Sequence, residues 1–391
     1  MRVCFVVQRY GLEINGGAEL HCRWVAEHMG KHWDVEVLTT QAYDYVTWAN
    51  HYPETETEVN GIPVRRFPVD RPRSPERFGR IQNYILENEH REEDELDWLE
   101  EEGPLVPSLI EHVRSVESRF DYFIFFSYRY YHSFYGIKAI PGKSILVPTA
   151  ERDPVVHLRI FRDLFRLPRA FVYNSYEERA MIQGLSRNEA VPGDVVGVGT
   201  EVPSSYDEAR FRAKFAVEAP YVIYVGRIDE NKGCHKLFEH FLRFKEETGS
   251  PVQLLLVGNT ILPIPDHPDV RHLGFLSEQD KFDGIAGSHA LMMPSFYESL
   301  SMVTLEAWAM GKPVLANAAC DVLHGQCRRS NGGLFYEDYA EFRGALALLL
   351  DDAALREALG RNGRAYFDAN YTWDVIERKY LAIVAGLEGR S

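Results

Sequence analysis

Two segments of the sequence carry charged residues at spacings that suit a bound diphosphate. The first, Tyr221–Gly233, is a short apolar run followed by Gly226, Arg227 and, five positions later, Lys232. A strand of this kind, buried in a parallel sheet, would end at Gly226, where the missing side chain leaves room for a ligand. Arginine offers a planar fork of donors and lysine a compact charge, and both bind phosphate oxygens. Alone, however, two such cations are more often ordinary loop residues.

A second segment, Met293–Ala307, reads as a strand, a turn and the start of a helix, and it carries Glu298 and Glu306. If the residues between the two glutamates are helical, a rise of about 1.5 Å per residue offsets their carboxylates by roughly 12 Å along the axis. That offset suits the hydroxyls at two ends of an extended ligand, a sugar and a ribose, better than a close acid–base pair. The first N–H groups of a helix lack intrahelical acceptors and bind anions. We expect those groups at Ser299, Leu300, Ser301, Met302 and Val303.

Together these segments resemble glycosyltransferase family 4, the glycosyl transferases group 1, whose members have the GT-B fold. The resemblance is strongest over Met293–Val314, which ends in Glu306-Ala307-Trp308-Ala309-Met310-Gly311-Lys312-Pro313-Val314. It extends over most of the second half, through Val222–Gly233, Leu254–Gly258, Leu273–Ser277 and Asn331–Phe335. In the first half it depends mainly on Gly16-Gly17-Ala18-Glu19, a glycine pair between a predicted strand and a predicted helix.

The resemblance implies roles for the matching residues of the second half. Arg227 and Lys232 would clamp the donor diphosphate and offset the negative charge that grows on the leaving nucleotide. Glu306 would bind the ribose, and Glu298 would face the donor sugar. The backbone amides of Leu300–Val303 would support the sugar and the phosphates.

Three more positions complete the implied donor site. Leu276 follows Phe275, where the family meets the nucleobase through backbone groups. Gly16 and Gly17 would let the backbone of the first lobe approach the phosphates.

The first half departs from the family at the residue expected near the reacting sugar. Family members often have a His-Asp pair after a strand of the first lobe. Here the run Ile145–Val147 leads into Pro148-Thr149-Ala150-Glu151-Arg152-Asp153, without a histidine. Glu151 is the candidate for that place, with Asp153 or His157 sharing its work. His132 is a further candidate, although a histidine among aromatic residues is more often packed and hydrogen-bonded.

The resemblance implies transfer with retention of anomeric configuration and no required cofactor or metal. The sequence also lacks an Asp-x-Asp pair, so Arg227, Lys232 and a helix N-terminus would supply the positive charge on the diphosphate. By the resemblance, the donor would be a UDP- or GDP-linked sugar, and the residues do not distinguish the two. A carbohydrate acceptor, free or lipid-linked, fits a role in the synthesis of cell-surface polysaccharides or glycans.

Apolar runs separated by helical patterns predict an α/β protein with two doubly wound, Rossmann-like domains. The polar stretch Thr200–Pro220 separates the two sets of runs. We expect an acceptor-binding domain at residues 1–204 and a nucleotide-sugar-binding domain at 205–370. Residues 371–391 would form a helix that crosses back to the first domain. By the resemblance, the two domains face each other across a cleft.

The composition excludes several other classes of protein. The 391 residues include 43 Lys and Arg against 58 Asp and Glu, a net charge of −15 that argues against general binding of nucleic acid. The first apolar run, Val3–Val7, is too short for a signal peptide, and no apolar stretch is long enough to span a membrane. The five cysteines lack paired spacing. We therefore expect a cytoplasmic protein.

Charge is unevenly distributed in the first half. Residues 87–102 include ten acidic residues and a single arginine, Arg91, which predicts a solvated helix. Eleven arginines lie around it in the sequence: Arg65, Arg66, Arg71, Arg73, Arg77, Arg80, Arg152, Arg159, Arg162, Arg166 and Arg169. They would form a basic face for a membrane surface or an anionic acceptor, or pair with the acidic helix; the sequence favours neither.

Other functions are less well supported. A dinucleotide-binding oxidoreductase would need a Gly-x-Gly-x-x-Gly turn after the first strand, and none is present. A nucleotide-sugar epimerase or hydrolase of the same architecture stays open. So does a catalytically silent protein that binds nucleotide sugar, because of the missing histidine.

Overall fold

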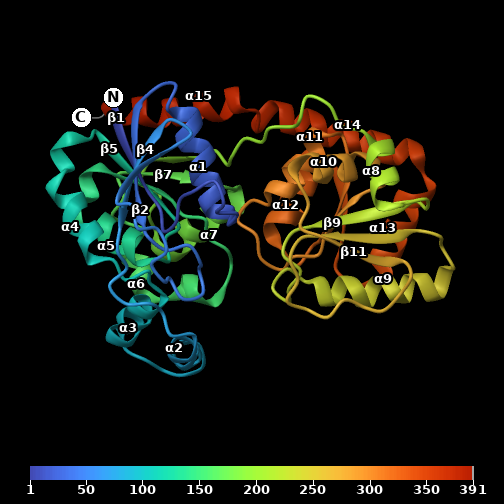
Figure 1. Ribbon diagram of the computed structural model, residues 1–391, viewed down its shortest axis with the longest axis horizontal. Coiled ribbons are helices and arrows are strands. Elements are labelled where there is room, and N and C mark those ends of the chain that lie inside the picture. The colour runs from blue at the N-terminus through green and yellow to red at the C-terminus, as the bar shows by residue number, and fades with distance from the viewer. Residues whose placement is uncertain (390–391) are drawn as a thin grey trace. The chain divides into compact units, whose positions relative to one another are not determined.

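The computed structural model describes residues 1–389, which form two units, each with its own β-sheet (Figure 1). Unit 1 contains Met1–Val198 together with the chain from Ile376 onward, and unit 2 contains Gly199–Val375. Each sheet has helices packed on both of its faces, so the predicted fold class of two doubly wound α/β domains is confirmed.

The sheet of unit 1 has eight strands in the order β3-β4-β2-β1-β5-β6-β7-β8. All neighbouring strands are parallel except β3 and β4, which form an antiparallel pair at one edge. The strands are β1 (Arg2–Val6), β2 (Asp34–Thr40), β3 (Glu56–Val59), β4 (Ile62–Phe67), β5 (Tyr122–Phe126), β6 (Ser144–Val147), β7 (Ala170–Tyr173) and β8 (Gly193–Val195).

The helices of unit 1 bury both faces of its sheet. They are α1 (Gly17–Met29), α2 (Pro75–Glu87), α3 (Glu92–Glu102), α4 (Pro107–Ser115), α5 (Tyr131–Ala139), α6 (Arg159–Leu164), α7 (Tyr176–Ser186) and α15 (Trp373–Glu388). Short 3-10 turns lie at Glu117–Arg119, Pro141–Lys143 and Pro154–His157. One core joins Val6 and Phe125 of the strands to Leu109 of α4 and Phe134 of α5. On α1, His21 contacts Phe126 edge-on, with ring centroids 5.2 Å apart.

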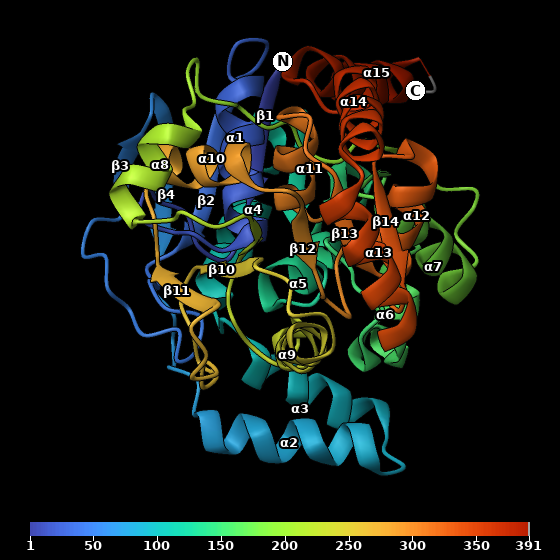
Figure 2. The same ribbon diagram turned by 90° about the vertical axis from the view of Figure 1, so that its right-hand side faces the viewer.

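The prediction of one solvated acidic helix at residues 87–102 is wrong. The segment is not one solvated helix, because α2 ends at Glu87 and α3 begins at Glu92. The two helices lie side by side (Figures 1 and 2). Helix α3 buries Trp98 and Leu99, and three of its glutamates, Glu95, Glu101 and Glu102, are at most 3% exposed. Apolar positions and buried ion pairs therefore draw this helix inward.

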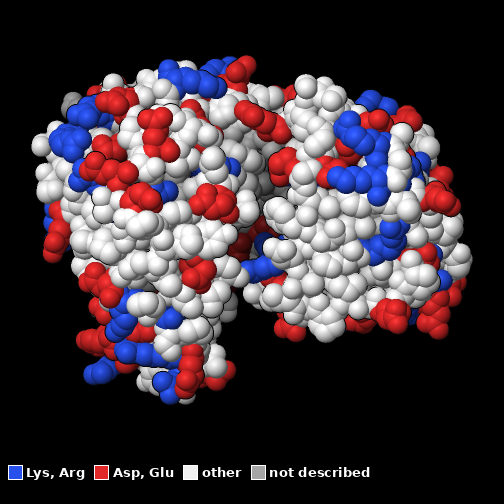
Figure 3. All heavy atoms as spheres, viewed as in Figure 1, with Lys and Arg blue, Asp and Glu red and all other residues white. Residues whose placement is uncertain are grey.

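Arginines beside α3 neutralise two of these buried carboxylates, Glu101 and Glu102. Arg71 and Arg77 pair with Glu101 at 2.5 and 3.1 Å, and Arg73 pairs with Glu102 at 3.6 Å. Figure 3 shows positive and negative side chains intermixed over the α2–α3 region. This agrees with the predicted pairing between arginines and the acidic helix, and contact with a membrane surface stays a prediction. Within the described residues, no helix has the length and apolar character needed to cross a bilayer.

Helix α15 joins unit 1 through its polar side. Glu377 accepts hydrogen bonds from His28 Nδ1 at 2.8 Å and His32 Nε2 at 2.7 Å, both on or just after α1. On its apolar side, Ile376, Tyr380 and Val384 are buried. The chain therefore returns to unit 1 after completing unit 2.

The sheet of unit 2 has six parallel strands in the order β11-β10-β9-β12-β13-β14. They are β9 (Tyr221–Val225), β10 (Gln253–Val257), β11 (Val270–Gly274), β12 (Leu291–Met293), β13 (Val314–Asn317) and β14 (Gly333–Tyr336). The order runs outward in both directions from β9 and β12. The topology therefore reverses between these two central strands.

Seven helices of the described chain cover the sheet of unit 2. They are α8 (Glu208–Phe215), α9 (Cys234–Thr248), α10 (Glu278–Gly287), α11 (Met302–Ala309), α12 (Asp321–Ser330), α13 (Tyr339–Asp351) and α14 (Ala353–Asn370). Phe241 of α9 and Leu346 of α13 pack with Tyr224 and Leu256 on one face. On the opposite face, Phe211 of α8 stacks on Tyr221 of β9. Helix α10 packs against α8, and α11 packs against α10 (Figure 1).

The sequence did not predict four strands, β3, β4, β11 and β14. These lie toward the sheet edges, and their residues alternate in burial or remain partly exposed. A continuous apolar run, the signal of a strand buried on both faces, is therefore missing. The apolar run Val195–Val198 would also predict a strand there, but β8 is Gly193–Val195 and shares only Val195 with that run.

Close helix packing in unit 2 predicts opposite effects for two glycine substitutions. A Cβ atom on Gly360 of α14 would lie 1.9 Å from the carbonyl oxygen of Gly311, whereas one on Gly344 of α13 would meet nothing within 4 Å. Gly360→Ala should therefore lower the free energy of unfolding by roughly 1–3 kcal/mol. Gly344→Ala should raise it by about 0.5–1 kcal/mol, because alanine favours helix. Urea unfolding followed by circular dichroism measures both, and shifts of the same sign would contradict the packing argument.

Candidate functional site

The predicted residues of the second half gather where the topology of unit 2 reverses. The loop after β9 carries Arg227 and Lys232, and the loop after β12 carries Glu298. Because β9 and β12 are parallel neighbours, both loops leave the same edge of the sheet. The carboxyl edge at such a reversal is where open α/β sheets bind ligands.

The two loops approach each other backbone to backbone. Gly233 has φ +69°, and a Cβ atom on it would lie 2.1 Å from the carbonyl oxygen of Pro294. The same oxygen accepts a hydrogen bond from Asn317 Nδ2 at 3.0 Å. A side chain at Gly233 would therefore separate the cationic loop from the glutamate loop.

Lys232 and Glu298 form the central ion pair of this edge. Lys232 Nζ lies 2.8 Å from Glu298 Oε1. Glu298 is only 12% exposed, so the pair is largely shielded from water. The structure thus brings together two of the predicted catalytic residues, which are 66 positions apart.

Asp229 organises the cationic loop and was not singled out from the sequence. Its carboxylate is 2% exposed, forms a short ion pair with Arg227, and accepts the backbone N–H of Lys232 at 2.7 Å. A buried acid between two cations is recognisable only when the fold of the loop is known. Asp229 fixes the spacing of Arg227 and Lys232 without neutralising both.

The helical spacing expected between Glu298 and Glu306 also differs from the structure. Helix α11 begins at Met302, so Glu298 lies in the preceding loop and the helical offset assumed from the sequence does not apply. Ser301, with φ +67°, is the cap residue, and its hydroxyl lies 2.9 Å from that of Thr304. Gln326 of α12 fixes the same turn by donating to the Leu300 carbonyl at 2.8 Å. The first N–H groups of α11 therefore begin at Met302, so Met302 and Val303 are in the helix as expected, whereas Ser299 and Leu300 lie in the loop before it.

Glu306 lies on α11 and is 3% exposed. Its Oε1 accepts a hydrogen bond from Lys281 Nζ of α10 at 2.8 Å. Its Oε2 is buried and has no hydrogen-bond partner within the described chain. Burial raises the pKa of the Glu306 carboxyl, and Lys281 opposes that effect only in part. A buried acceptor without a partner is costly, so this oxygen is suited to a ligand donor.

The remaining donor-site predictions for unit 2 lie at strand ends. Gly226 has φ +150° and follows β9, and its carbonyl oxygen would be 2.0 Å from a Cβ atom on Gly258 after β10. Leu276 is partly exposed in the turn between β11 and α10, beside Phe275, which is 63% exposed. These positions lie in loops on the same side of unit 2 as Arg227, as expected for carboxyl ends of parallel strands.

In unit 1, Gly16 is the N-cap of α1 and Gly17 is the first residue of that helix, and the two have different surroundings. A Cβ atom on Gly16 would lie 2.2 Å from Glu19 Oε2, whereas one on Gly17 would have nothing within 4 Å. Glu19 Oε1 accepts from Arg9 Nε at 2.8 Å, and both residues are buried. Gly16 is therefore required by a buried ion pair, and Gly17 leaves open space at the first residue of the helix.

The loop that replaces the His-Asp pair is anchored by two groups that sequence reasoning missed. Glu178, buried at the start of α7, accepts the backbone N–H of Ala150 at 2.6 Å. Arg129 bridges Asp153 and Glu102, at 3.1 and 2.7 Å. Glu151 lies between these two anchors in the sequence, so its backbone is held on both sides.

His132 has the packed environment that is usual for a histidine among aromatic residues. It is fully buried, and its Nε2 lies 3.1 Å from the Phe126 carbonyl, which makes it the donor. Burial lowers the pKa of His132 to about 4. His157, by contrast, is exposed in the 3-10 turn after Asp153.

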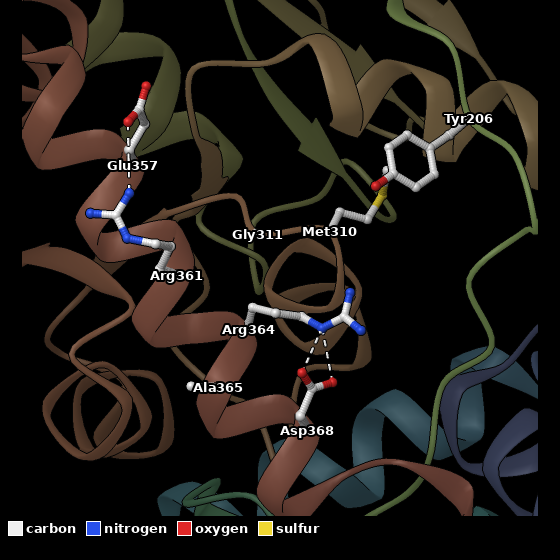
Figure 4. A pocket seen from close by; sticks show the side chains of 8 residues that line it. All are labelled: Tyr206, Met310, Gly311, Glu357, Arg361, Arg364, Ala365 and Asp368. Atoms are coloured by element: carbon white, nitrogen blue, oxygen red, sulfur yellow. Dashed lines mark hydrogen bonds and ion pairs between the residues drawn. The ribbon is translucent and has the colours of Figure 1, made fainter.

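A shallow pocket of about 520 Å³ lies elsewhere in unit 2 (Figure 4). Its charged residues pair with one another, Arg361 with Glu357 and Arg364 with Asp368. None of its lining residues belongs to the cluster of Arg227, Lys232, Glu298 and Glu306. The pocket therefore offers no separate set of convergent polar groups.

Comparison with known proteins agrees with the resemblance. Residues 205–366 match the family described as Glycosyl transferases group 1, which confirms it. The capsular polysaccharide biosynthesis glycosyltransferase CapM of Staphylococcus aureus is 26% identical over 182 residues, 43% of this chain and 47% of CapM. The lipopolysaccharide glucosyltransferase WaaG of Escherichia coli K12 is 25% identical over 198 residues, 48% of this chain and 53% of WaaG. The chain thus spans about half the length of these two curated relatives.

Solved structures extend the likeness over both units. Sucrose-phosphate synthase from Thermosynechococcus elongatus superposes with a TM-score of 0.73 at 18% identity, covering 100% of each chain. Anabaena Alr3699/HepE in complex with UDP and glucose gives a TM-score of 0.70 at 16% identity, covering 98% of this chain and 99% of that one. At these identities the likeness concerns the fold, and the fold is GT-B.

Substitutions of Gly16, the N-cap of α1, and of Gly17, its first residue, should have separable effects on stability and on nucleotide binding. Gly16→Ala should lower the melting temperature, because the new methyl group meets the buried pair of Glu19 and Arg9. Gly17→Ala should leave the melting temperature within about 1 °C but weaken the stabilisation produced by added UDP or GDP, if phosphates approach this backbone. Thermal unfolding of both variants with and without each nucleotide measures this. Equal nucleotide stabilisation in wild type and Gly17→Ala would remove Gly17 from the donor site.

Proposed function

We propose that this chain, whose residues 205–366 match the glycosyl transferases group 1, is a retaining glycosyltransferase that uses a nucleoside-diphosphate sugar. One observation carries the proposal. The Lys232–Glu298 pair lies immediately before the N-terminus of α11, and the same helix holds Glu306 with a buried oxygen that lacks a partner. A diphosphate, a sugar and a ribose each find a matching group in this arrangement.

The chemistry follows from where charge develops during transfer. Breaking the bond between the sugar and the diphosphate leaves a negative charge on the nucleotide. Arg227, Lys232 and the first N–H groups of α11 are positioned by the fold before that charge appears, so they stabilise it with little reorganisation. Glu298 holds Lys232 through one oxygen, and its other oxygen is the proposed acceptor for sugar hydroxyls.

Glu306 is the proposed ribose-binding residue. Ribose hydroxyls donate hydrogen bonds, and the buried Oε2 of Glu306 is an acceptor without a partner in the described chain. Leu276 and Gly226 lie in the neighbouring strand-end loops and are proposed to contact the nucleotide through backbone groups. Gly16 and Gly17 are the proposed contribution of unit 1 to the donor phosphates.

The acceptor is proposed to be a carbohydrate of a cell-surface polysaccharide or glycan. Support comes from the named roles of relatives, capsular polysaccharide biosynthesis for CapM and lipopolysaccharide for WaaG. For the donor, Alr3699/HepE has been solved in complex with UDP-glucose, which favours testing UDP sugars before GDP sugars. Glu151 is the proposed unit 1 residue near the reacting sugar, in the place of the missing histidine.

Substitution of the two key side chains tests the proposal. Glu306→Ala should weaken binding of the donor nucleotide by at least about tenfold, because a charged acceptor is lost. Lys232→Ala should chiefly lower turnover, by roughly 100- to 1000-fold, because its charge acts on the leaving group. Calorimetric titration with UDP and GDP gives the affinities, and release of nucleotide from UDP- and GDP-sugars with oligosaccharide acceptors gives the rates. Unchanged values in both variants would contradict the site assignment.

The same assays separate transfer from the alternatives. A silent binding protein would bind the donor without turnover, with or without acceptor. An epimerase would convert the donor sugar in the absence of acceptor and release no nucleotide. Transfer requires both release of nucleotide and a product of increased mass from the acceptor.

Transfer should not depend on a divalent metal. Arg227, Lys232 and the N-terminus of α11 supply positive charge at the proposed diphosphate position, and the sequence has no Asp-x-Asp pair. We expect the rate in excess EDTA to stay within about twofold of the untreated rate, as an effect of preorganised cations. Loss of activity that added Mn²⁺ restores would argue against this account.

A further inference from the structure

Lys281 of α10 has an environment that is unusual for a lysine. Its side chain is only 13% exposed, and its Nζ lies 2.8 Å from carboxylate oxygens of both Glu306 and Glu278. Glu278 is 69% exposed, so the buried member of this trio is Glu306. The ammonium group therefore lies between solvent and the proposed ribose-binding carboxylate.

This contact makes the two carboxylate oxygens of Glu306 inequivalent. Oε1 is held by Lys281, and Oε2 is buried and lacks a partner in the described residues. A carboxylate that is tethered through one oxygen has little freedom to rotate about its terminal torsion. Its second oxygen is therefore presented in one fixed direction.

We propose that Lys281 is a positioning residue that holds the Glu306 carboxylate so that Oε2 accepts a hydrogen bond from the ribose 2′,3′-diol of the donor nucleotide. The inference rests on the proposed function, because it assigns a purpose to Lys281 only if a ribonucleotide binds here. It goes beyond that function by naming the group that makes Glu306 competent.

Charge is the second part of this role. Burial raises the pKa of Glu306, and Lys281 is the positive group that opposes this effect. Burial lowers the pKa of Lys281, but Glu306 and Glu278 outweigh burial and leave it raised. Each member of the pair thus shifts the pKa of the other toward its charged form. Without Lys281, the pKa of Glu306 would rise further, and the protonated carboxyl would be a poorer acceptor at neutral pH.

Other elements packed on α11 add no competing charge at this carboxyl. Strands β12 and β13 carry no titratable side chains. On α14, Arg364 donates to the Ala309 carbonyl and pairs with Asp368, and neither residue is among the groups that shift the pKa of Glu306. On α10, Glu278 acts in the same direction as burial and raises the pKa of Glu306. Among the groups of the described chain that act on Glu306, Lys281 is thus the one that lowers its pKa.

The test compares Lys281→Met with Lys281→Arg from pH 6 to pH 9. The probes are UDP and GDP, each with its 2′,3′-dideoxy counterpart, and their affinities are measured by calorimetric titration. The variants are then compared with whichever of UDP and GDP binds the wild type more tightly. Lys281→Met should weaken binding of that ribonucleotide by roughly 10- to 100-fold at pH 7, and by less at pH 9, where a larger fraction of the Glu306 carboxyl is ionised. Lys281→Arg should retain affinity within about threefold. The dideoxy nucleotide should bind wild type and Lys281→Met equally, because it lacks the hydroxyls that Oε2 accepts.

Matched variants keep the outcome decisive. Glu278→Gln removes only the exposed partner of Lys281 and should leave affinity within about twofold. If Lys281→Met loses its native circular dichroism, Lys281→Gln, which keeps a donor but no charge, carries the same comparison. Equal losses for ribo- and dideoxynucleotides, or a pH-independent loss, would overturn the positioning role. If wild type binds neither UDP nor GDP, the proposed function itself fails together with this inference; if wild type binds and the Lys281 variants match it, only the inference fails.

Discussion

The close approach of two loop backbones at the carboxyl edge of unit 2 is the constraint on which the proposed site depends. Gly233 lies so near the Pro294 carbonyl that no side chain fits between them. That contact brings the cationic loop after β9 to the glutamate loop after β12, and the Lys232–Glu298 pair follows from it. Asp229 then sets the position of Arg227 within the same loop. Backbone packing, rather than attraction between the charges, is what gathers these groups at the reversal of strand order.

In unit 1 a candidate loop is held by side chains rather than by close backbone packing. Its loop from Ala150 to Asp153 is held by polar side chains, Glu178 at one end and Arg129 at the other. Arg129 also pairs with Glu102 of α3. The acidic segment therefore has an internal function, since its buried carboxylates neutralise and orient arginines of unit 1. The strongly negative net charge of the chain gives no indication of this arrangement.

The sequence largely predicted which residues of unit 2 lie together at the carboxyl edge of its sheet, but it did not predict the contacts of unit 1. In unit 2 the cations and glutamates follow continuous apolar runs that form buried central strands, so sequence spacing translates directly into position. Asp229 and Lys281 were missed because an acid or a lysine in a polar stretch looks solvated until its neighbours are known. The break before α11 was missed because Glu298–Ser301 has no proline or glycine to interrupt a helical pattern. In unit 1, α3 was mistaken for a solvated helix, since its burial depends on arginines from other segments.

The route of the chain also bears on how the molecule is made. Unit 2 is one continuous segment, Gly199–Val375, whereas unit 1 is completed only by residues from Ile376 onward. During synthesis on the ribosome, every strand and helix of unit 2 emerges before α15 is available to pack against α1. Unit 1 therefore cannot acquire its complete set of contacts until unit 2 has been translated. Until then, the surface of α1 that later binds Glu377 stays uncovered in the nascent chain.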